Sequence, residues 1–127
     1  MLPALAKRLL TETDARILGK FIYCFAWKGM RAVSAFDKRV KSGHYVPAFL
    51  FLSVTDRCNL SCQGCWMTET TPPRELSLAT MDRVVTQAKV YGSRFFGLLG
   101  GEPLLHPRLF ELIERHPDCY FQIFTNG

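Results

Sequence analysis

The chain has 127 residues, of which 48% are hydrophobic and 21% are charged, and its formal net charge is +5. This composition is ordinary for a soluble globular protein and excludes wholesale disorder. The length allows one domain and excludes a complete eight-unit α/β barrel, which needs about 250 residues. The longest stretch without a charged side chain has 14 residues, whereas a membrane-spanning helix needs about 20.

The positive charge is concentrated near the N-terminus. Residues 1–45 contain nine Lys and Arg against three Asp and Glu, a net charge of +6, and residues 46–127 have a net charge of −1. A nucleic-acid module would carry basic residues over its whole binding face, so we expect no nucleic-acid partner. Pro47 marks a junction. We therefore predict a basic amphipathic helical arm in residues 1–45, followed by a separate region in residues 46–127.

A long helix is predicted in the arm, because apolar residues recur there at steps of three and four. The face that they form contains Leu18, Ile22, Phe25, Gly29, Val33, Phe36 and Val40. Asp14 is a candidate N-cap, and Gly43 is placed to end the helix. A shorter helix is predicted around residues 5–10. The arm has three interpretations: docking on the core with its charged face in water, peripheral contact with an anionic membrane, or binding of a partner or nucleic acid.

The second region alternates strand and helix patterns. Short apolar runs predict three strands, at residues 48–54, 94–99 and 119–124. The first run is continuous, which is typical of a strand buried on both faces. Ser77 and Gly92 are candidate ends of one helix, and Pro107 and Pro117 bound a second. This order predicts an α/β fold in which a β-α-β-α-β unit forms a parallel sheet.

A distinctive loop follows each predicted strand. The first strand precedes a cysteine-rich loop, the second precedes Gly100-Gly101-Glu102-Pro103, and the third precedes Thr125-Asn126-Gly127. The carboxyl ends of parallel strands share one edge of the sheet, and ligands bind at that edge in α/β folds. We therefore expect the three loops to converge on one site.

The cysteine-rich loop has the spacing C-x3-C-x2-C, with Cys58, Cys62 and Cys65 inside eight residues. Three thiols this close can surround one compact metal centre. A structural zinc site and a conventional [4Fe–4S] cluster both need four protein ligands. Three cysteines would therefore leave one coordination position open, as in sites that bind and activate a ligand.

The alternative function is a non-catalytic zinc-binding or iron–sulfur module. It requires a distant fourth ligand, such as Cys24, Cys119 or a histidine, and it assigns no role to the Gly-Gly-Glu-Pro motif. We expect Cys24 and Cys119 to be inert core residues. Disulfides are disfavoured because the cysteine count of five is odd and no secretory pattern precedes them.

Together, the cysteine motif after the first strand and Gly-Gly-Glu-Pro after the second resemble the radical S-adenosylmethionine (radical SAM) enzymes over residues 49–127. The resemblance implies the start of a partial (β/α)6 TIM-like barrel. It implies that Cys58, Cys62 and Cys65 ligate three irons of a [4Fe–4S] cluster and that the SAM methionine moiety binds the fourth. Reductive cleavage of SAM would then yield a 5′-deoxyadenosyl radical, which abstracts hydrogen from an unknown substrate.

The resemblance also implies cofactor contacts at the other two loops. Gly100, Gly101 and Glu102 correspond to the element that holds the SAM amino group, and Pro103 would fix the turn. Glycine suits close approach of a ligand to the backbone, and a carboxylate suits an ammonium group. No catalytic residue is assigned beyond the cluster ligands.

Three further residues are candidates for this site. Thr125 and Asn126 are candidate contacts of the cofactor or the substrate. The family often has an aromatic residue immediately before the last cysteine, near the adenine, but this chain has Gly64 there. Trp66 is the candidate substitute.

For the whole protein, the resemblance implies two kinds of partner, SAM and a one-electron donor such as ferredoxin or flavodoxin. It also implies a reducing, cytoplasmic location. The cysteine loop favours the branch that matures peptides and cofactors. With three of the family's six strands predicted, we expect residues 46–127 to be the N-terminal part of a longer radical SAM core. We expect this truncated chain not to complete turnover alone, and its third strand to have an unpaired edge.

Overall fold

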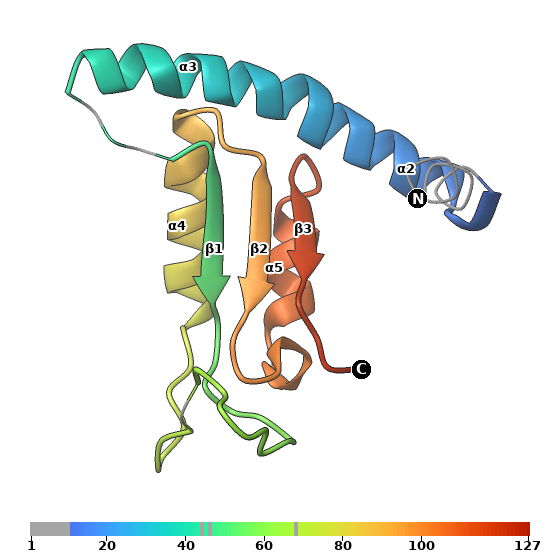
Figure 1. Cartoon of the computed structure of the whole chain (residues 1–127), viewed down its shortest axis with the longest axis vertical. Helices are drawn as coiled ribbons and strands as arrows, with labels where there is room; N and C mark the ends of the chain where they lie inside the picture. The colour runs from blue at the N-terminus through green and yellow to red at the C-terminus, as the bar shows by residue number, and fades with distance from the viewer. Residues whose placement is uncertain (1–10, 44, 46, 68) are drawn as a thin grey trace.

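The computed structural model describes residues 11–43, 45, 47–67 and 69–127. Three parallel strands form one sheet in the order β1-β2-β3 (Figure 1). They are β1 (Phe49–Ser53), β2 (Phe95–Leu99) and β3 (Tyr120–Ile123). Their positions and parallel pairing agree with the prediction and define an α/β fold, consistent with the start of a TIM-like barrel.

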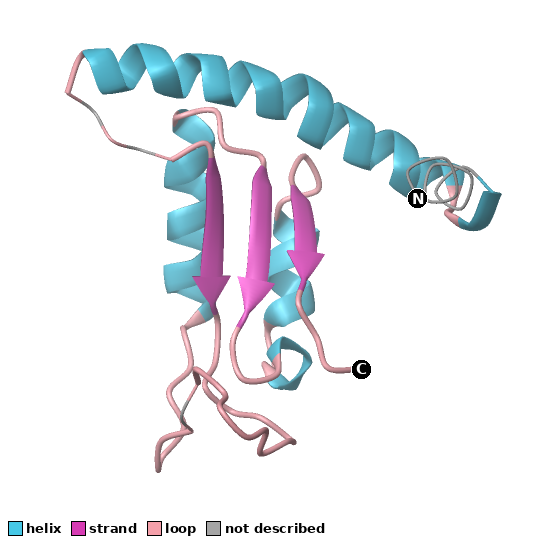
Figure 2. Cartoon of the chain, in the orientation of Figure 1, coloured by secondary structure: helices cyan, strands magenta, loops and turns pink. Residues whose placement is uncertain are grey.

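Two helices connect the strands and cover the same face of the sheet (Figure 2). They are α4 (Leu78–Val90) and α5 (Leu109–Arg115). The Ser77 hydroxyl accepts a hydrogen bond from the Thr80 N–H at 3.2 Å, which confirms the predicted N-cap of α4. Gly92 follows the helix with a φ of +88°, a conformation that glycine adopts without steric cost.

The core lies between this face and the two helices. It combines alternate residues of the strands with one face of each helix. Its buried members are Leu52, Val54, Met81, Val85, Ala88, Phe96, Leu98, Leu109, Leu112 and Cys119. The prediction that the first strand is buried on both faces was wrong. Phe51 and Ser53 lie on the other face of the sheet, which α4 and α5 do not cover, and both are exposed.

The N-terminal arm is one continuous helical rod across the amino ends of the strands (Figure 1). It consists of α2 (Ala15–Phe21), the π-helical segment η1 (Ile22–Gly29) and α3 (Met30–Lys41). The Asp14 side chain accepts from the Arg16 N–H at 2.8 Å, which confirms the predicted N-cap. The shorter helix predicted around residues 5–10 lies outside the described residues. No helix in the described part of the chain is long and apolar enough to span a bilayer.

The π-helical segment changes which side of the arm is buried. Cys24, Gly29 and Ala32 are buried against the rest of the protein. By contrast, Ile22 and Phe25 of the predicted apolar face are 52% and 44% exposed. The prediction assumed 3.6 residues per turn, and a π-helix has a longer hydrogen-bonded repeat that shifts later residues around the axis. The predicted apolar face is therefore only partly the docked face.

Aromatic packing joins the arm to the sheet. The first residues of the three strands, Phe49, Phe95 and Tyr120, lie in register across the sheet. The Phe25 ring packs 5.9 Å from Phe49 and 5.4 Å from Phe95, between ring centroids. The Phe21 ring lies 5.2 Å from Tyr120. These five residues form what we call the aromatic cluster, and such ring pairs add about 0.5–1.5 kcal/mol each beyond burial.

Candidate metal and cofactor site

The three loops at the carboxyl ends of the strands converge, as predicted (Figure 2). The Gly101 N–H donates to the Thr55 carbonyl at 2.9 Å, which joins the turn after β2 to the loop after β1. The Asn126 side-chain amide donates to the Asn59 side-chain oxygen at 2.9 Å, which joins the segment after β3 to the same loop. One rim therefore carries all three motifs.

Glycine is needed at positions 100 and 101 because the turn after β2 packs closely against the loop after β1. A Cβ atom on Gly100 would lie 2.3 Å from the Thr55 carbonyl oxygen. A Cβ atom on Gly101 would lie 2.4 Å from the Arg57 carbonyl oxygen. The close approach at both glycines is therefore made by the protein's own backbone, whereas the sequence suggested approach by a ligand. These glycines set the distance between the cysteine loop and the turn after β2.

Glu102 links the turn after β2 to the segment after β3. Its side chain is only 3% exposed, and its carboxylate accepts from the Leu104 N–H at 2.9 Å. The same carboxylate accepts from the Thr125 hydroxyl at 2.9 Å and the Asn126 N–H at 2.8 Å. Burial alone would raise the pKa of Glu102, but these hydrogen bonds outweigh it and leave the pKa lowered. Glu102 is thus an ionised cross-link between two motifs.

This arrangement limits what Glu102 can offer to a ligand. A carboxylate has about four lone-pair directions, and three are already used by protein donors. Contact with the SAM ammonium therefore stays a prediction that depends on the one remaining direction. Pro103 begins a short 3-10 turn, η2 (Pro103–Leu105), and is buried beside Glu102. This placement fits the expected role of Pro103 in fixing the turn.

The three cysteines of the loop have free thiols, and they line a common cavity of about 400 Å³. Cys58 is half-buried, and Cys62 and Cys65 are exposed. Gly101 and Asn126 line the same cavity, so all three loops contribute to its wall. The Asn126 amide nitrogen lies 3.8 Å from the Cys58 sulfur. The described residues contain no group of three or more His, Cys, Asp or Glu side chains already positioned to hold a metal ion.

The donor set nevertheless fits an iron–sulfur cluster. Thiolates are the ligands that such clusters take, and the three sulfurs are accessible in one loop. Gly64, which precedes the last cysteine, has a φ of +74°, a conformation that strongly favours glycine over an aromatic residue. Trp66 is 70% exposed and does not line the cavity, so the structure does not bring it to the predicted adenine position.

Asp56 organises the cysteine loop, although the sequence pattern did not single it out. Its buried carboxylate accepts from the Thr70 hydroxyl at 2.7 Å and from the Arg74 N–H at 2.8 Å. The hydrogen bond from Thr70 is the main cause of the lowered pKa of Asp56. Asp56 thereby ties the start of the loop to its end. The only signal in the sequence was an acidic residue two positions before the first cysteine of the motif, and its partners follow at no regular spacing.

Cys24 and Cys119 lie at the opposite end of the sheet, under the arm. Both are buried, and burial raises the pKa of Cys119 to about 11. Their position excludes them as ligands completing a site at the cysteine loop in this structure. The burial of both thiols, together with the raised pKa of Cys119, agrees with the prediction that they are inert core residues.

Comparison with known proteins assigns the family. A family model of the radical SAM superfamily matches residues 52–127, and the chain belongs to this family. Radical SAM enzymes use a [4Fe–4S] cluster and SAM, which the three free cysteines fit.

The curated relatives that match share only part of their length with this chain. The GTP 3′,8-cyclase of Synechococcus sp. (strain CC9605) is 45% identical over 65 residues, which cover 51% of this chain and 19% of the relative. The GTP 3′,8-cyclase of Desulforamulus reducens is 44% identical over 71 residues, covering 53% and 22%. Molybdenum cofactor biosynthesis protein 1 of Mus musculus is 33% identical over 72 residues, covering 54% and 11%. The chain thus spans about a fifth or less of these relatives. No solved structure matches it significantly.

Proposed function

We propose that residues 46–127 form the N-terminal part of the core of a radical SAM enzyme. In this proposal Cys58, Cys62 and Cys65 ligate three irons of a [4Fe–4S] cluster, and SAM binds the fourth. The observation that carries it is the cavity lined by these three thiols together with Gly101 and Asn126 from the other loops. When bound and reduced, the cluster supplies the electron that cleaves SAM to a 5′-deoxyadenosyl radical.

The protein's own residues position these groups. Gly100 and Gly101 let the turn after β2 pack against the cysteine loop, so that both face the same cavity. Glu102 holds Thr125 and Asn126 at the rim through its carboxylate. We propose that Thr125 and Asn126 contact the cofactor or the substrate. Trp66 stays a candidate adenine contact that would have to turn inward.

Anaerobic reconstitution of the chain with iron and sulfide tests the cluster proposal. We expect a broad brown absorbance and, after reduction, an electron paramagnetic resonance signal that changes when SAM is added. Serine at Cys58, Cys62 or Cys65 should abolish the signal, because each removes one iron ligand. The control variant Cys24→Ala, at the other end of the sheet, should keep it. Stoichiometric zinc with no response to SAM would overturn the proposal in favour of a zinc module.

For the whole protein, we propose GTP as the substrate, on the activity named for the relatives. We also propose a one-electron donor such as ferredoxin or flavodoxin and a reducing cytoplasmic location. The test adds GTP to the reconstituted whole protein with SAM and a chemical reductant. GTP consumption together with 5′-deoxyadenosine formation supports the substrate. SAM cleavage that leaves GTP unchanged would reject GTP and leave the radical SAM function intact.

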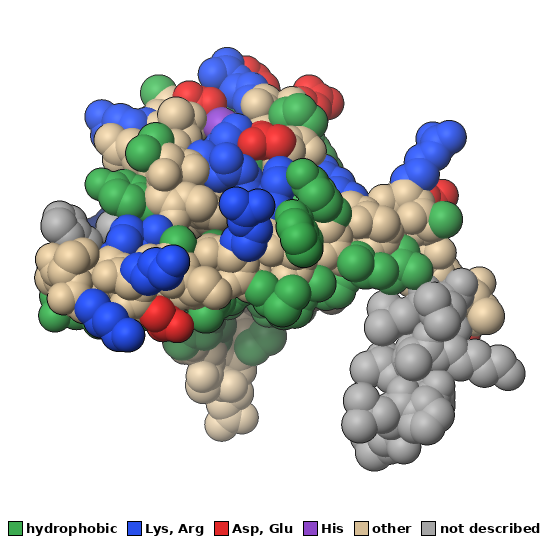
Figure 3. All heavy atoms as spheres, turned by 90° about the horizontal axis from the view of Figure 1, so that it is seen from above, with side chains coloured by type: hydrophobic (Ala, Val, Ile, Leu, Met, Phe, Trp, Pro, Cys, Tyr) green, Lys and Arg blue, Asp and Glu red, His purple; other side chains and the backbone are tan. Residues whose placement is uncertain are grey.

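The exposed side of the arm favours a second candidate function, peripheral contact with an anionic membrane. Ile22 and Met30 are exposed on a helix that also carries Lys20 and Lys38. Figure 3 shows hydrophobic and basic side chains gathered along the surface of the arm. Such a surface suits the interface of an anionic bilayer. The protein should co-sediment with anionic vesicles at low salt, and serine at Ile22 and Met30 should weaken this. A protein that stays in the supernatant at low salt would exclude the contact.

A further inference from the structure

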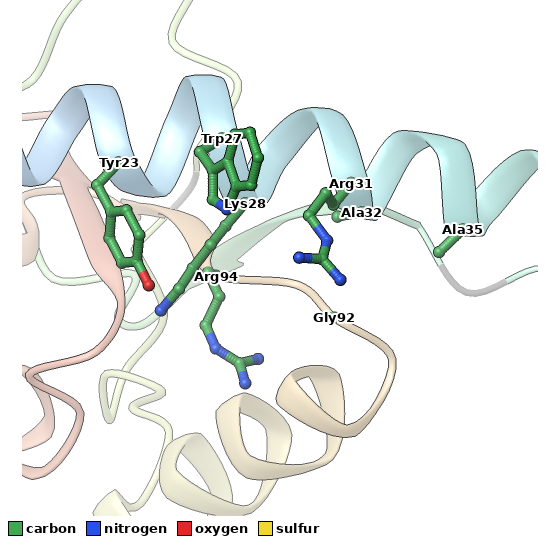
Figure 4. A pocket seen from close by; sticks show the side chains of 8 residues that line it. All are labelled: Tyr23, Trp27, Lys28, Arg31, Ala32, Ala35, Gly92 and Arg94. Atoms are coloured by element: carbon green, nitrogen blue, oxygen red, sulfur yellow. The ribbon is translucent and has the colours of Figure 1, made fainter.

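A second pocket, of about 410 Å³, lies between the arm and the turn that leads into β2 (Figure 4). It is at the amino ends of the strands, whereas the cysteine loop follows their carboxyl ends. It is lined by Tyr23, Trp27, Lys28, Arg31, Ala32, Ala35, Gly92 and Arg94. All of these residues are described, and none belongs to the cysteine loop. The volume falls within the range of about 300–1,000 Å³ typical of small-molecule sites.

The charged side chains that line this pocket are all cationic. Arg31 forms no hydrogen bond or ion pair within the described part of the chain. Arg94 pairs through Nε with the Asp118 carboxylate at 3.3 Å, but Asp118 also pairs with Lys89 at 2.6 Å. One carboxylate is thus shared by two cations. The pocket therefore has an excess of positive charge that an anion would offset.

Two of the three cations, Lys28 and Arg31, extend into the pocket. In Figure 4 the ends of the Tyr23 and Lys28 side chains lie close together, and Arg31 points into the space above the Gly92 turn. Arg94 extends toward the end of α4, where its Nη1 donates to the Lys89 and Ser93 carbonyls at 2.8 and 2.9 Å. The Lys28 ammonium lies 4.6 Å from the centroid of the Tyr23 ring, which holds it on this side of the arm by a cation–π interaction. A ligand in this pocket would therefore meet the Lys28 ammonium together with the Tyr23 ring, and also the Arg31 guanidinium.

We propose that this pocket binds an organic phosphate, with the phosphate on Lys28, Arg31 and Arg94 and the organic part against Tyr23 and Trp27. A phosphate suits the site better than a single carboxylate, because it offers several charged oxygens to several cations and matches the fork of arginine. The pocket and the proposed radical site lie at opposite ends of the sheet. The ligand is therefore separate from the substrate of the radical reaction. It is either a soluble phosphorylated compound or the headgroup of a lipid.

Binding of simple probes to the whole chain, without cluster reconstitution, tests this proposal. Pyrophosphate in calorimetry represents a soluble ligand, and phosphatidylcholine vesicles with and without phosphatidic acid represent a lipid. Arg31→Gln should weaken binding about tenfold, as expected for a charge-assisted contact. The matched control Lys41→Gln removes the same charge from the same helix outside the pocket and should change affinity by less than about twofold. Arg31 has no described partner, so its replacement should leave the fold intact, which circular dichroism checks.

Each outcome decides between the sources or rejects the site. Saturable pyrophosphate binding that depends on Arg31 supports a soluble phosphate ligand. Vesicle binding that needs both phosphatidic acid and Arg31, without pyrophosphate binding, supports a lipid headgroup. Binding weakened equally by Arg31→Gln and Lys41→Gln would overturn the proposal, because it would reflect net charge alone. Absence of binding to both probes would overturn it as well. Neither result bears on the iron–sulfur site, because no cluster is present in the experiment.

Discussion

The two ends of the sheet are held together by different interactions. At the amino ends, five aromatic rings pack between the strands and the arm. At the carboxyl ends, glycine backbone and the Glu102 carboxylate join the three loops by hydrogen bonds. Apolar packing tolerates some change of shape, whereas buried hydrogen bonds demand fixed partners. The rim with the cysteine motif is therefore the end where small substitutions should have the larger effect.

The cysteines show the same contrast. The three thiols of the rim are accessible to solvent, and the two under the arm are buried. A ligand or metal can reach only the first group without unfolding. Solvent exposure therefore distinguishes the cysteines that are candidate metal ligands from the cysteines that only pack in the core.

Thiol alkylation tests this contrast and has the largest expected effect. With iodoacetamide at neutral pH, Cys58, Cys62 and Cys65 should react with the native chain. Cys119 should react at least about a hundredfold more slowly, because burial raises its pKa from 9.0 to about 11 and lowers its thiolate fraction. Mass spectrometry counts the modified sites, and the urea-unfolded chain, with all five thiols modified, is the control. Rapid native modification of Cys119 would contradict the buried position.

A methyl group at Gly100 should disturb the rim most among single substitutions. Gly100→Ala places Cβ against the Thr55 carbonyl at 2.3 Å, so backbone must move. We expect a loss of about 3 kcal/mol in the free energy of unfolding, measured by denaturant titration. Gly19→Ala is the matched control, since nothing lies within 4 Å of its Cβ position. In a helix this change should stabilise by up to about 1 kcal/mol. Equal stabilities of the two variants would show that the loops are not packed as described.

Removing the charge of Glu102 should separate the second and third motifs. Glu102→Gln puts an amide donor among three donors, and we expect it to lower the free energy of unfolding by about 2 kcal/mol. The pKa of Glu102 is lowered in the folded state, so its contribution is present above its unfolded pKa. It is lost as pH falls through the folded pKa. The difference between wild type and variant, followed by denaturant titration, should therefore shrink in acid.

Glu114→Gln, at an exposed position of α5, is the control for this experiment. It should change stability by less than about 0.5 kcal/mol at any pH. A Glu102→Gln protein that behaves like this control would mean that the carboxylate does not hold the 125–126 segment.

A substitution in the aromatic cluster should lower the free energy of unfolding less than the substitutions at the rim. Phe25→Ala removes ring contacts with Phe49 and Phe95, but the side chain is already partly exposed. We expect a loss of about 1 kcal/mol and faster proteolysis within the arm, with cluster assembly at the rim unchanged. Ile17→Ala, an exposed apolar residue of the same arm, should leave proteolysis as in the wild type. Loss of cluster assembly in Phe25→Ala would show that the two ends are coupled.

Local sequence signals determined most of the element positions. The caps Asp14 and Ser77, the stop at Gly92 and the alternation of strands and helices all follow from interactions within a few residues. Their hydrogen bonds and dihedral preferences are local, so they can be predicted without knowing the rest of the fold. Convergence of the three motifs also followed, because parallel topology places every strand's carboxyl end on one edge.

Tertiary structure alone decided how these parts meet. The π-helical segment sets which side of the arm docks, and the aromatic cluster combines two residues of the arm with one residue from each of the three strands. Glycine is needed at position 100 because the Thr55 carbonyl, 45 positions earlier, lies against it. The hydrogen-bond partner Thr125 of Glu102 lies just after the end of the next strand. The phosphate pocket likewise draws its cations from Lys28 and Arg94, far apart in the chain. Such contacts depend on long-range packing, which no periodicity or spacing in the sequence specifies.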